Sequence, residues 1–134
     1  MNKQAPYILV VDDEQDIRQL VSEILEDEGY QVAMAENAAE ARKQKQQRAP
    51  NLILLDIWMP DCDGITLLRE WVAEDDGLCP VIMMSGHASV ESAVEATRLG
   101  AYDFLEKPLS LAKLLLIVER ALETNSLQRE NAGL

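Results

Sequence analysis

Several residue types are scarce in this 134-residue chain, and each scarcity excludes a class of protein. The two cysteines, Cys62 and Cys79, lack the spacing of a disulfide framework or a zinc site, and one histidine cannot complete an imidazole-rich metal centre. Twelve basic residues stand against 24 acidic ones, which gives a formal net charge of −12. Because this excess repels phosphate backbones and anionic lipids, we expect binding to neither nucleic acid nor a membrane surface.

Long apolar runs are also missing. No stretch approaches the roughly 18 consecutive apolar residues of a membrane-spanning helix, and the N-terminus has no signal-peptide pattern. We therefore predict a cytoplasmic protein whose residues 1–6 are disordered. The composition is that of an ordinary globular protein, with 48% apolar and 27% charged residues, and the length fits one compact domain with a short tail.

Short apolar runs predict strands that are buried on both faces, as in a parallel sheet covered by helices. The clearest runs are Tyr7–Val11, residues 52–55 and residues 81–84, and weaker candidates are residues 31–34 and 103–105. The chain therefore has five candidate strands, spaced widely enough for a helix between each pair.

Helical patterns fill these intervals. The predicted helices are one around residues 17–25, one that begins after Asn37 and ends before Pro50, and three at residues 65–73, 90–99 and 111–122. Gly29 and Gly100 stand where a left-handed C-terminal cap belongs, and Asn37 followed by Glu40 has the pattern of a capping box. This alternation predicts an α/β fold, a doubly wound, flavodoxin-like parallel sheet of order 2-1-3-4-5 with five helices.

Acidic residues follow the first and third predicted strands, whose carboxyl ends meet at the ligand-binding edge of such a sheet. Asp12 and Asp13 come directly after the first strand, and Asp56 after the third. Two carboxylates about 4 Å apart repel by about 4 kcal/mol at an effective dielectric constant of about 20, so the cluster needs a cation or a raised pKa. Carboxylate oxygens suit Mg²⁺. The alternative is that each aspartate merely caps the next helix or turn.

The ends of the fourth and fifth predicted strands add groups that fit a phosphoryl ligand. Lys107 would lie beside the carboxylates, Ser85 offers a hydroxyl, and Pro108 after a strand predicts a cis peptide bond. Together these groups predict phosphoryl transfer to one aspartate. Asp56 is the better nucleophile, because the adjacent aspartates after the first strand suit metal binding. Taken singly, Lys107 would be a surface lysine and Ser85 a turn residue.

The segments ILVVDDE, LLDIWMPDCDG, MMSGHA and FLEKP resemble, in this order, the motifs of bacterial two-component response-regulator receiver domains. The segment SGHASVESAVEATRLGAYDFLEKPL is most similar to receivers of NtrC- and NtrX-type regulators, which act with sigma-54. The resemblance implies a CheY-like fold in which Asp56 accepts phosphate from a sensor histidine kinase. It also implies Mg²⁺ held by Asp13, Asp56 and the backbone carbonyl of Trp58, with Asp12 contributing through water.

The same resemblance assigns Lys107 to phosphoryl binding and makes Ser85 and Phe104 the switch residues, although Phe104 lacks the hydroxyl of the tyrosine often found there. Phosphorylation adds about −1.5 to −2 charge, and repacking of Phe104 would alter the face of the fourth helix, fifth strand and fifth helix. The alternative is that Phe104 is only a core aromatic. Trp58, two residues after Asp56, either shields the acyl phosphate from water or only covers the rim of the site.

Partners follow from the resemblance as well. NtrC- and NtrX-type regulators carry an AAA+ ATPase and a DNA-binding domain, so we expect such an output domain in the full-length protein and a homodimer on phosphorylation. Residues 7–122 would form the receiver. Residues 123–134 would be a helix extension or linker toward the output domain absent here, or a frayed tail.

Three other functions fit parts of the pattern. A Mg²⁺-dependent aspartyl phosphatase, similar to haloacid dehalogenases, would need a second acid where this chain has Trp58. A flavodoxin-type electron carrier would place a flavin phosphate beside Asp12, Asp13 and Glu14, which repel it. A degenerate receiver that only binds a partner is disfavoured by the complete set of carboxylates and Lys107. We expect no enzyme beyond catalysis of the chain's own phosphorylation and dephosphorylation.

Overall fold

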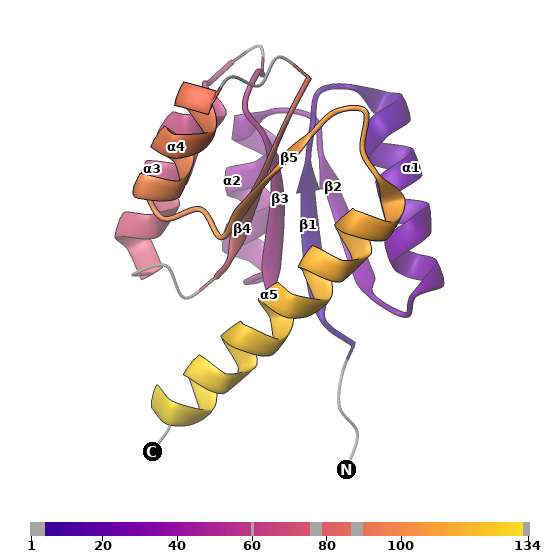
Figure 1. The fold of residues 1–134 in the computed structure, drawn as a ribbon, viewed down its shortest axis with the longest axis vertical. Coiled ribbons are helices and arrows are strands. Elements are labelled where there is room, and N and C mark those ends of the chain that lie inside the picture. The colour runs from indigo at the N-terminus through magenta and orange to yellow at the C-terminus, as the bar shows by residue number, and fades with distance from the viewer. Residues whose placement is uncertain (1–4, 60, 76–78, 87–89, 133–134) are drawn as a thin grey trace.

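The computed structural model describes residues 5–59, 61–75, 79–86 and 90–132. Over these residues, the strands are β1 (Tyr7–Val11), β2 (Gln31–Ala35), β3 (Leu52–Asp56), β4 (Val81–Ser85) and β5 (Asp103–Glu106). The helices are α1 (Gln15–Asp27), α2 (Ala38–Gln47), α3 (Gly64–Asp75), α4 (Val90–Arg98) and α5 (Leu111–Ala132). The strands pair in parallel in the order β2-β1-β3-β4-β5, so the predicted fold class and strand order are confirmed (Figure 1).

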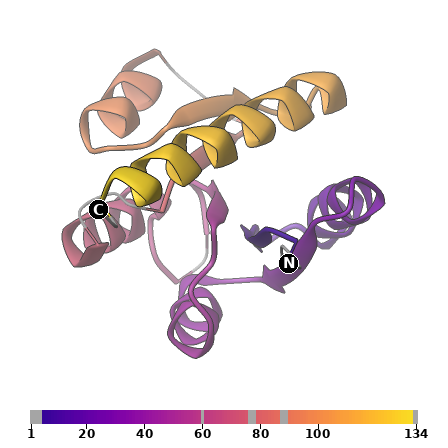
Figure 2. The same ribbon diagram turned by 90° about the horizontal axis from the view of Figure 1, so that it is seen from below.

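Helices cover both faces of the sheet (Figures 1 and 2). Residues such as Leu9 and Leu55 pack against α2, α3 and α4 in one core, whereas Ile8 and Leu54 pack against α1 and α5 in the other. Strands β1, β3 and β4 are therefore buried along their whole length, which explains their continuous apolar runs. Edge strand β2 is more exposed, which explains why its apolar run in the sequence was a weaker strand signal.

Strands β2, β3, β4 and β5 each run one residue farther than predicted, because the residue after the apolar run still pairs in the sheet. Two of these added residues, Asp56 and Ser85, are predicted site residues. The predicted caps are present: Asn37 Oδ1 accepts the backbone N–H of Glu40 at 2.8 Å, and Gly29 and Gly100 have φ of +93° and +114°.

Helix α5 is longer than its predicted range of residues 111–122 and continues to Ala132, beyond the lower end of the sheet in Figure 1. No glycine or proline interrupts residues 111–132, and many of them favour helix. The part of residues 123–134 that the structure describes is helical.

The N-terminal residues are only partly described. Residues 1–4 of the predicted disordered segment lie outside the described ranges, whereas the carbonyl of Pro6 accepts the N–H of Gln31 at 2.9 Å. Among the helices that the structure describes, none combines the length and apolar character that a membrane span requires.

Candidate functional site

The predicted acidic residues lie together at the carboxyl edge of the sheet. Asp56 ends β3 and pairs with Met84 of β4, and Asp12 follows β1, where its N–H donates to the carbonyl of Ala35 at 3.1 Å. One carboxylate oxygen from each of Asp12, Asp13 and Asp56 lies within 4.8 Å of the other two. The predicted meeting of these three aspartates is therefore found in the structure.

Burial differs sharply within this cluster. Asp12 is fully buried and Asp56 is 3% exposed, whereas Asp13 is exposed. The Oδ1 atom of Asp12 accepts the backbone N–H of Glu14 at 2.8 Å. The cluster therefore has a buried floor and opens to solvent on the side of Asp13.

Lys107 is the cation closest to these carboxylates among the described residues. Its Nζ lies 2.7 Å from Asp12 Oδ2, 3.1 Å from Glu14 Oε1 and 3.7 Å from Asp56 Oδ1. Its side chain is only 10% exposed. One ammonium group thus faces three carboxylates, and the ion pair with Glu14 is a contact that sequence reasoning missed, because nothing in the local pattern links residues so far apart.

The remaining predicted site residues surround this cluster. Ser85 is fully buried at the end of β4, and its carbonyl accepts the N–H of Lys107 at 2.8 Å. The Lys107–Pro108 peptide bond is cis, as predicted. Phe104 lies in β5 and is half-buried against the core beneath α2, α3 and α4, while 56% of the Trp58 surface is exposed. The roles of Ser85, Phe104 and Trp58 as switch or ligand stay predictions.

Burial and repulsion shift the pKa values of the cluster. Burial, followed by the charge of Asp12, raises the pKa of Asp56 to about 7, although Lys107 acts in the opposite direction. Burial also raises the pKa of Asp12, despite its hydrogen bonds with Lys107 and the Glu14 N–H. Burial alone would lower the pKa of Lys107, but its bond to Asp12 and the surrounding carboxylates raise it. Oxygen ligands that repel one another this strongly fit a divalent cation.

The loop between β3 and α3 turns back toward the main chain of Asp56 at a glycine that sequence reasoning did not single out. The N–H of Gly64 donates to the carbonyl of Ile57 at 2.7 Å. A Cβ atom at position 64 would lie 2.8 Å from the Cα of Ile57 and even closer to the carbonyl oxygen of Asp56. The Asp63-Gly64 pair marks a turn in the sequence, but this close backbone approach depends on tertiary structure.

Comparisons with known proteins agree with this arrangement. The sequence matches the response regulator receiver domain family over residues 8–119. It is 50% identical over 125 residues to the nitrogen assimilation regulatory protein NtrX of Azorhizobium caulinodans, covering 92% of this chain and 27% of that protein. This chain therefore spans little more than a quarter of the length of that relative.

Solved structures are similar over nearly the whole chain. A crystal structure of NtrX from Brucella abortus matches with a TM-score of 0.89 and 49% identity, over 96% of this chain and 29% of that one. The beryllofluoride-activated NtrC4 receiver domain dimer, solved in solution, matches with a TM-score of 0.83 and 42% identity, over 89% of this chain and 98% of that one.

Proposed function

This chain belongs to the response regulator receiver domain family, and we propose that it receives the phosphoryl signal of a two-component system for an NtrX- or NtrC-type regulator. Asp56 would accept the phosphoryl group from a sensor histidine kinase. One observation carries the proposal: the buried carboxylate of Asp56 lies close to two further aspartates and to the ammonium group of Lys107. These are the groups that phosphoryl transfer to an aspartate requires.

Besides the phosphohistidine, the transfer step needs only a proton from water. A carboxylate oxygen of Asp56 attacks the phosphorus of the kinase phosphohistidine, and the new O–P bond forms as the P–N bond breaks. The bonding electrons leave with the histidine nitrogen, which takes up a proton from water. Lys107 Nζ, 3.7 Å from Asp56 Oδ1, is near enough to bind an oxygen of the transferred group. Ser85 would bind a second oxygen through its hydroxyl.

The donor set fits Mg²⁺, which we propose as the cofactor. Asp12, Asp13 and Asp56 would hold it, with the backbone carbonyl of Trp58 as a further ligand. When bound, Mg²⁺ would offset the carboxylate charge, lower the pKa of Asp56 and stabilise negative charge on the phosphoryl oxygens. The exposure of Asp13 leaves this ligand set open to solvent, and therefore open to a phosphoryl donor.

Phosphorylation would change the packing next to the site. It would place about −1.5 to −2 charge beside Lys107 and Ser85, and Phe104 would repack toward the face of α4, β5 and α5. Among the described side chains of α4, α5 and the loop before β5, large apolar ones are exposed at Val94, Tyr102, Leu111 and Leu116. We infer that this face forms a homodimer on phosphorylation, and the dimer of the activated NtrC4 receiver supports the inference.

The output is proposed from the longer relatives. In a full-length protein of NtrX or NtrC type, the receiver would control an AAA+ ATPase and a DNA-binding domain in sigma-54-dependent transcription in the cytoplasm. The chain itself would bind no nucleic acid and would turn over no substrate beyond its own phosphorylation and dephosphorylation.

Intact mass spectrometry tests the proposal directly. After incubation with Mg²⁺ and acetyl phosphate, we expect a single phosphoryl adduct on the wild type and on Asp27→Asn, a control at an exposed aspartate that ends α1. Asp56→Asn and metal-free samples should show none. Absence of the adduct from a wild type that binds Mg²⁺ would instead indicate a receiver that only binds partners. Steady turnover of phosphate monoesters would indicate a phosphatase.

A further inference from the structure

We propose that Asp61 is a positioning residue of the phosphorylation site, because it ties the loop that follows Asp56 to the first turn of α2. The inference rests on the proposed function and extends it to a residue outside the carboxylate cluster. Asp61 lies in the loop between β3 and α3, which also contains Trp58, the residue whose backbone carbonyl is the predicted metal ligand.

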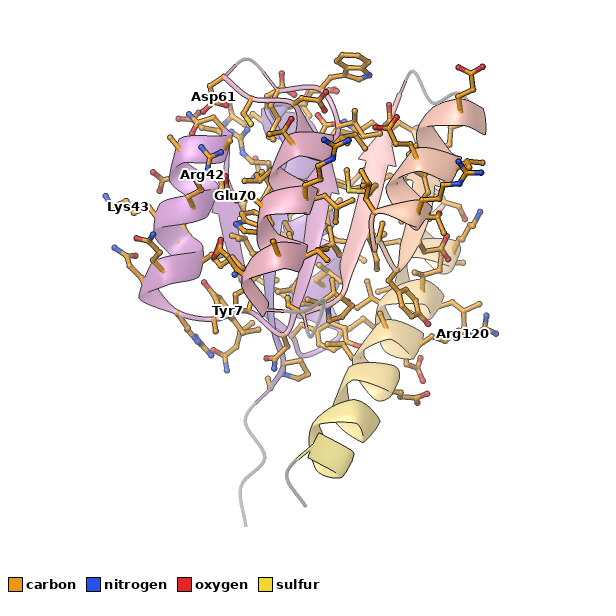
Figure 3. All side chains as sticks on the ribbon, turned by 90° about the vertical axis from the view of Figure 1, so that its left-hand side faces the viewer. Tyr7, Arg42, Lys43, Asp61, Glu70 and Arg120 are labelled. Carbon is orange, nitrogen blue, oxygen red and sulfur yellow. The ribbon has the colours of Figure 1, made fainter. Side chains whose placement is uncertain are left out.

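Asp61 binds α2 through both oxygens of its carboxylate. Oδ1 accepts the N–H of Ala38 at 3.0 Å and Oδ2 accepts the N–H of Ala39 at 3.1 Å. These N–H groups belong to the first turn of α2, where no helix carbonyl is available to them. The bonds, that of Ala38 foremost, hold the pKa of Asp61 below its usual value. Figure 3 shows Asp61 beside the end of α2, although Asp61 belongs to the loop between β3 and α3.

A second cap on the same turn comes from α2's own N-cap residue. Asn37 Oδ1 accepts the N–H of Glu40 at 2.8 Å. The helix would therefore keep a local cap without Asp61, so the distant carboxylate does more than complete the helix end. What Asp61 adds is a connection between α2 and the loop next to Asp56.

Arg42 strengthens the same connection from farther along α2. Its guanidinium forms a two-pronged ion pair with Glu70 of α3, at 2.8 and 3.1 Å (Figure 3). Its Nη2 also lies 3.8 Å from the Sγ of Cys62. Both partners of the ion pair are 39% exposed, so solvent weakens it. The loop is thus framed by α2 and α3, and Asp61 supplies its direct backbone tie to α2.

The position of the Trp58 carbonyl depends on ties at both sides of it. On one side, Ile57 is buried and its N–H donates to the carbonyl of Met84 at 3.1 Å. On the other side, Met59 packs against the core, and Asp61 is the nearest described residue that forms a hydrogen bond to a different element. The side chain of Trp58 is largely exposed and gives little packing of its own. Loss of the Asp61 tie would therefore let the carbonyl move relative to the aspartates.

Asp61→Ala, Asp61→Asn and Asn37→Ala separate positioning from helix capping. Metal affinity is measured with Mn²⁺ by electron paramagnetic resonance and by Mg²⁺ competition, without a phosphoryl donor and at high salt, so that loss of one negative charge has little effect. We expect Asp61→Ala to weaken Mg²⁺ binding about tenfold, as loss of an outer support of a metal ligand does. Asp61→Asn keeps one acceptor oxygen, so its Mg²⁺ affinity should fall less.

The control variant Asn37→Ala removes a cap from the same helix turn, and the bond that it removes, to the N–H of Glu40, lies within α2. Its melting temperature should fall, while its Mg²⁺ affinity stays at the wild-type value. Amide hydrogen exchange at residues 57–59 should speed up in Asp61→Ala and not in Asn37→Ala. The rate at which acetyl phosphate phosphorylates Asp56 in the Asp61→Ala variant should return to the wild-type value at saturating Mg²⁺, because Asp56 and Lys107 are intact.

Two outcomes would overturn the inference: equal loss of Mg²⁺ affinity in Asp61→Ala and Asn37→Ala, or wild-type affinity in both Asp61 variants. If Asp61→Ala does not fold, Asp61→Asn decides by the same comparison. Failure of the proposed function would give a different result: the wild type would bind Mg²⁺ but form no phosphoryl adduct on Asp56.

Discussion

The two ends of the sheet differ in how their polar and charged groups are paired. At the amino end, the N–H of Tyr7 donates to Asn51 Oδ1 at 2.8 Å, and the N–H of Asn51 donates back to the Tyr7 carbonyl at 2.7 Å. The guanidinium of Arg48 lies 4.0 Å from the centre of the Tyr7 ring. At the carboxyl end, by contrast, Lys107 must face three carboxylates, and Asp56 has a pKa of about 7.

The difference shows where the fold is stabilised and where it is kept reactive. Paired polar groups at the amino end satisfy one another and contribute to the free energy of unfolding. Crowded carboxylates at the other end reduce that free energy, because buried charges of like sign repel. The proposed binding of a cation and a phosphoryl group would use this unbalanced charge, so the two ends should respond differently to mutation.

The largest expected effect follows removal of the shared cation. Lys107→Met should slow phosphorylation of Asp56 by acetyl phosphate about 100-fold at saturating Mg²⁺, because the transferred oxygens lose a preorganised positive group. Time-resolved intact mass measures the rate. Lys43→Met, at an exposed lysine of α2, should match the wild type. A rate for Lys107→Met close to that of the wild type would show that Lys107 serves only to balance charge.

The raised pKa of Asp56 predicts a pH effect on stability in metal-free protein. The unfolded chain loses this proton near the ordinary value of 3.8, whereas the folded chain keeps it up to about pH 7. The folded state therefore binds more protons in this window, and its stability falls as pH rises from about 4 to about 7. Asp56→Asn should be more stable than the wild type by up to about 4 kcal/mol at pH 8, the linkage of a pKa raised from 3.8 to about 7.

Urea unfolding with a chelator present, at several pH values, measures this difference. The gap between Asp56→Asn and the wild type should close toward pH 4, and added Mg²⁺ should narrow it at pH 8 by stabilising only the wild type. A gap that does not vary with pH would mean that Asp56 is ionised throughout and that packing explains the change.

The smallest expected effect is at the amino end. Asn51→Ala removes the acceptor of the Tyr7 N–H, and should cost about 1 kcal/mol of unfolding free energy, typical of one hydrogen bond. Phosphorylation of Asp56 should proceed at the wild-type rate. Slower phosphorylation in a variant that remains folded would show that the two ends of the sheet are coupled, and would contradict the view that they act separately.

The strands and the aspartate cluster could be predicted from sequence because both depend on local pattern. Continuous apolar runs identified the buried strands, and topology then placed the residues after β1 and β3 at one edge. The different burial of Asp12 and Asp13 could not be predicted, because adjacent residues share one sequence context and differ only in direction. The same applies to Glu14, whose partner Lys107 comes from the far end of the chain.

Two further features lay beyond local pattern. In the sequence, Asp61 has the pattern of an ordinary loop aspartate. Its hydrogen bonds with α2 form only in the folded protein, and no sequence periodicity predicts a hydrogen bond between two elements. The length of α5 was open because polar helix formers suit both a helix and a solvated tail, and the composition after residue 122 favours neither strongly.

The close approach at Gly64 has a mechanical consequence. The start of α3 lies directly against the main chain of Asp56, and even a methyl group would not fit between them. Side chains can change rotamer and absorb small movements, but here no side chain intervenes. A displacement of the Asp56 main chain would therefore act directly on the first turn of α3, with no side chain between them to absorb it.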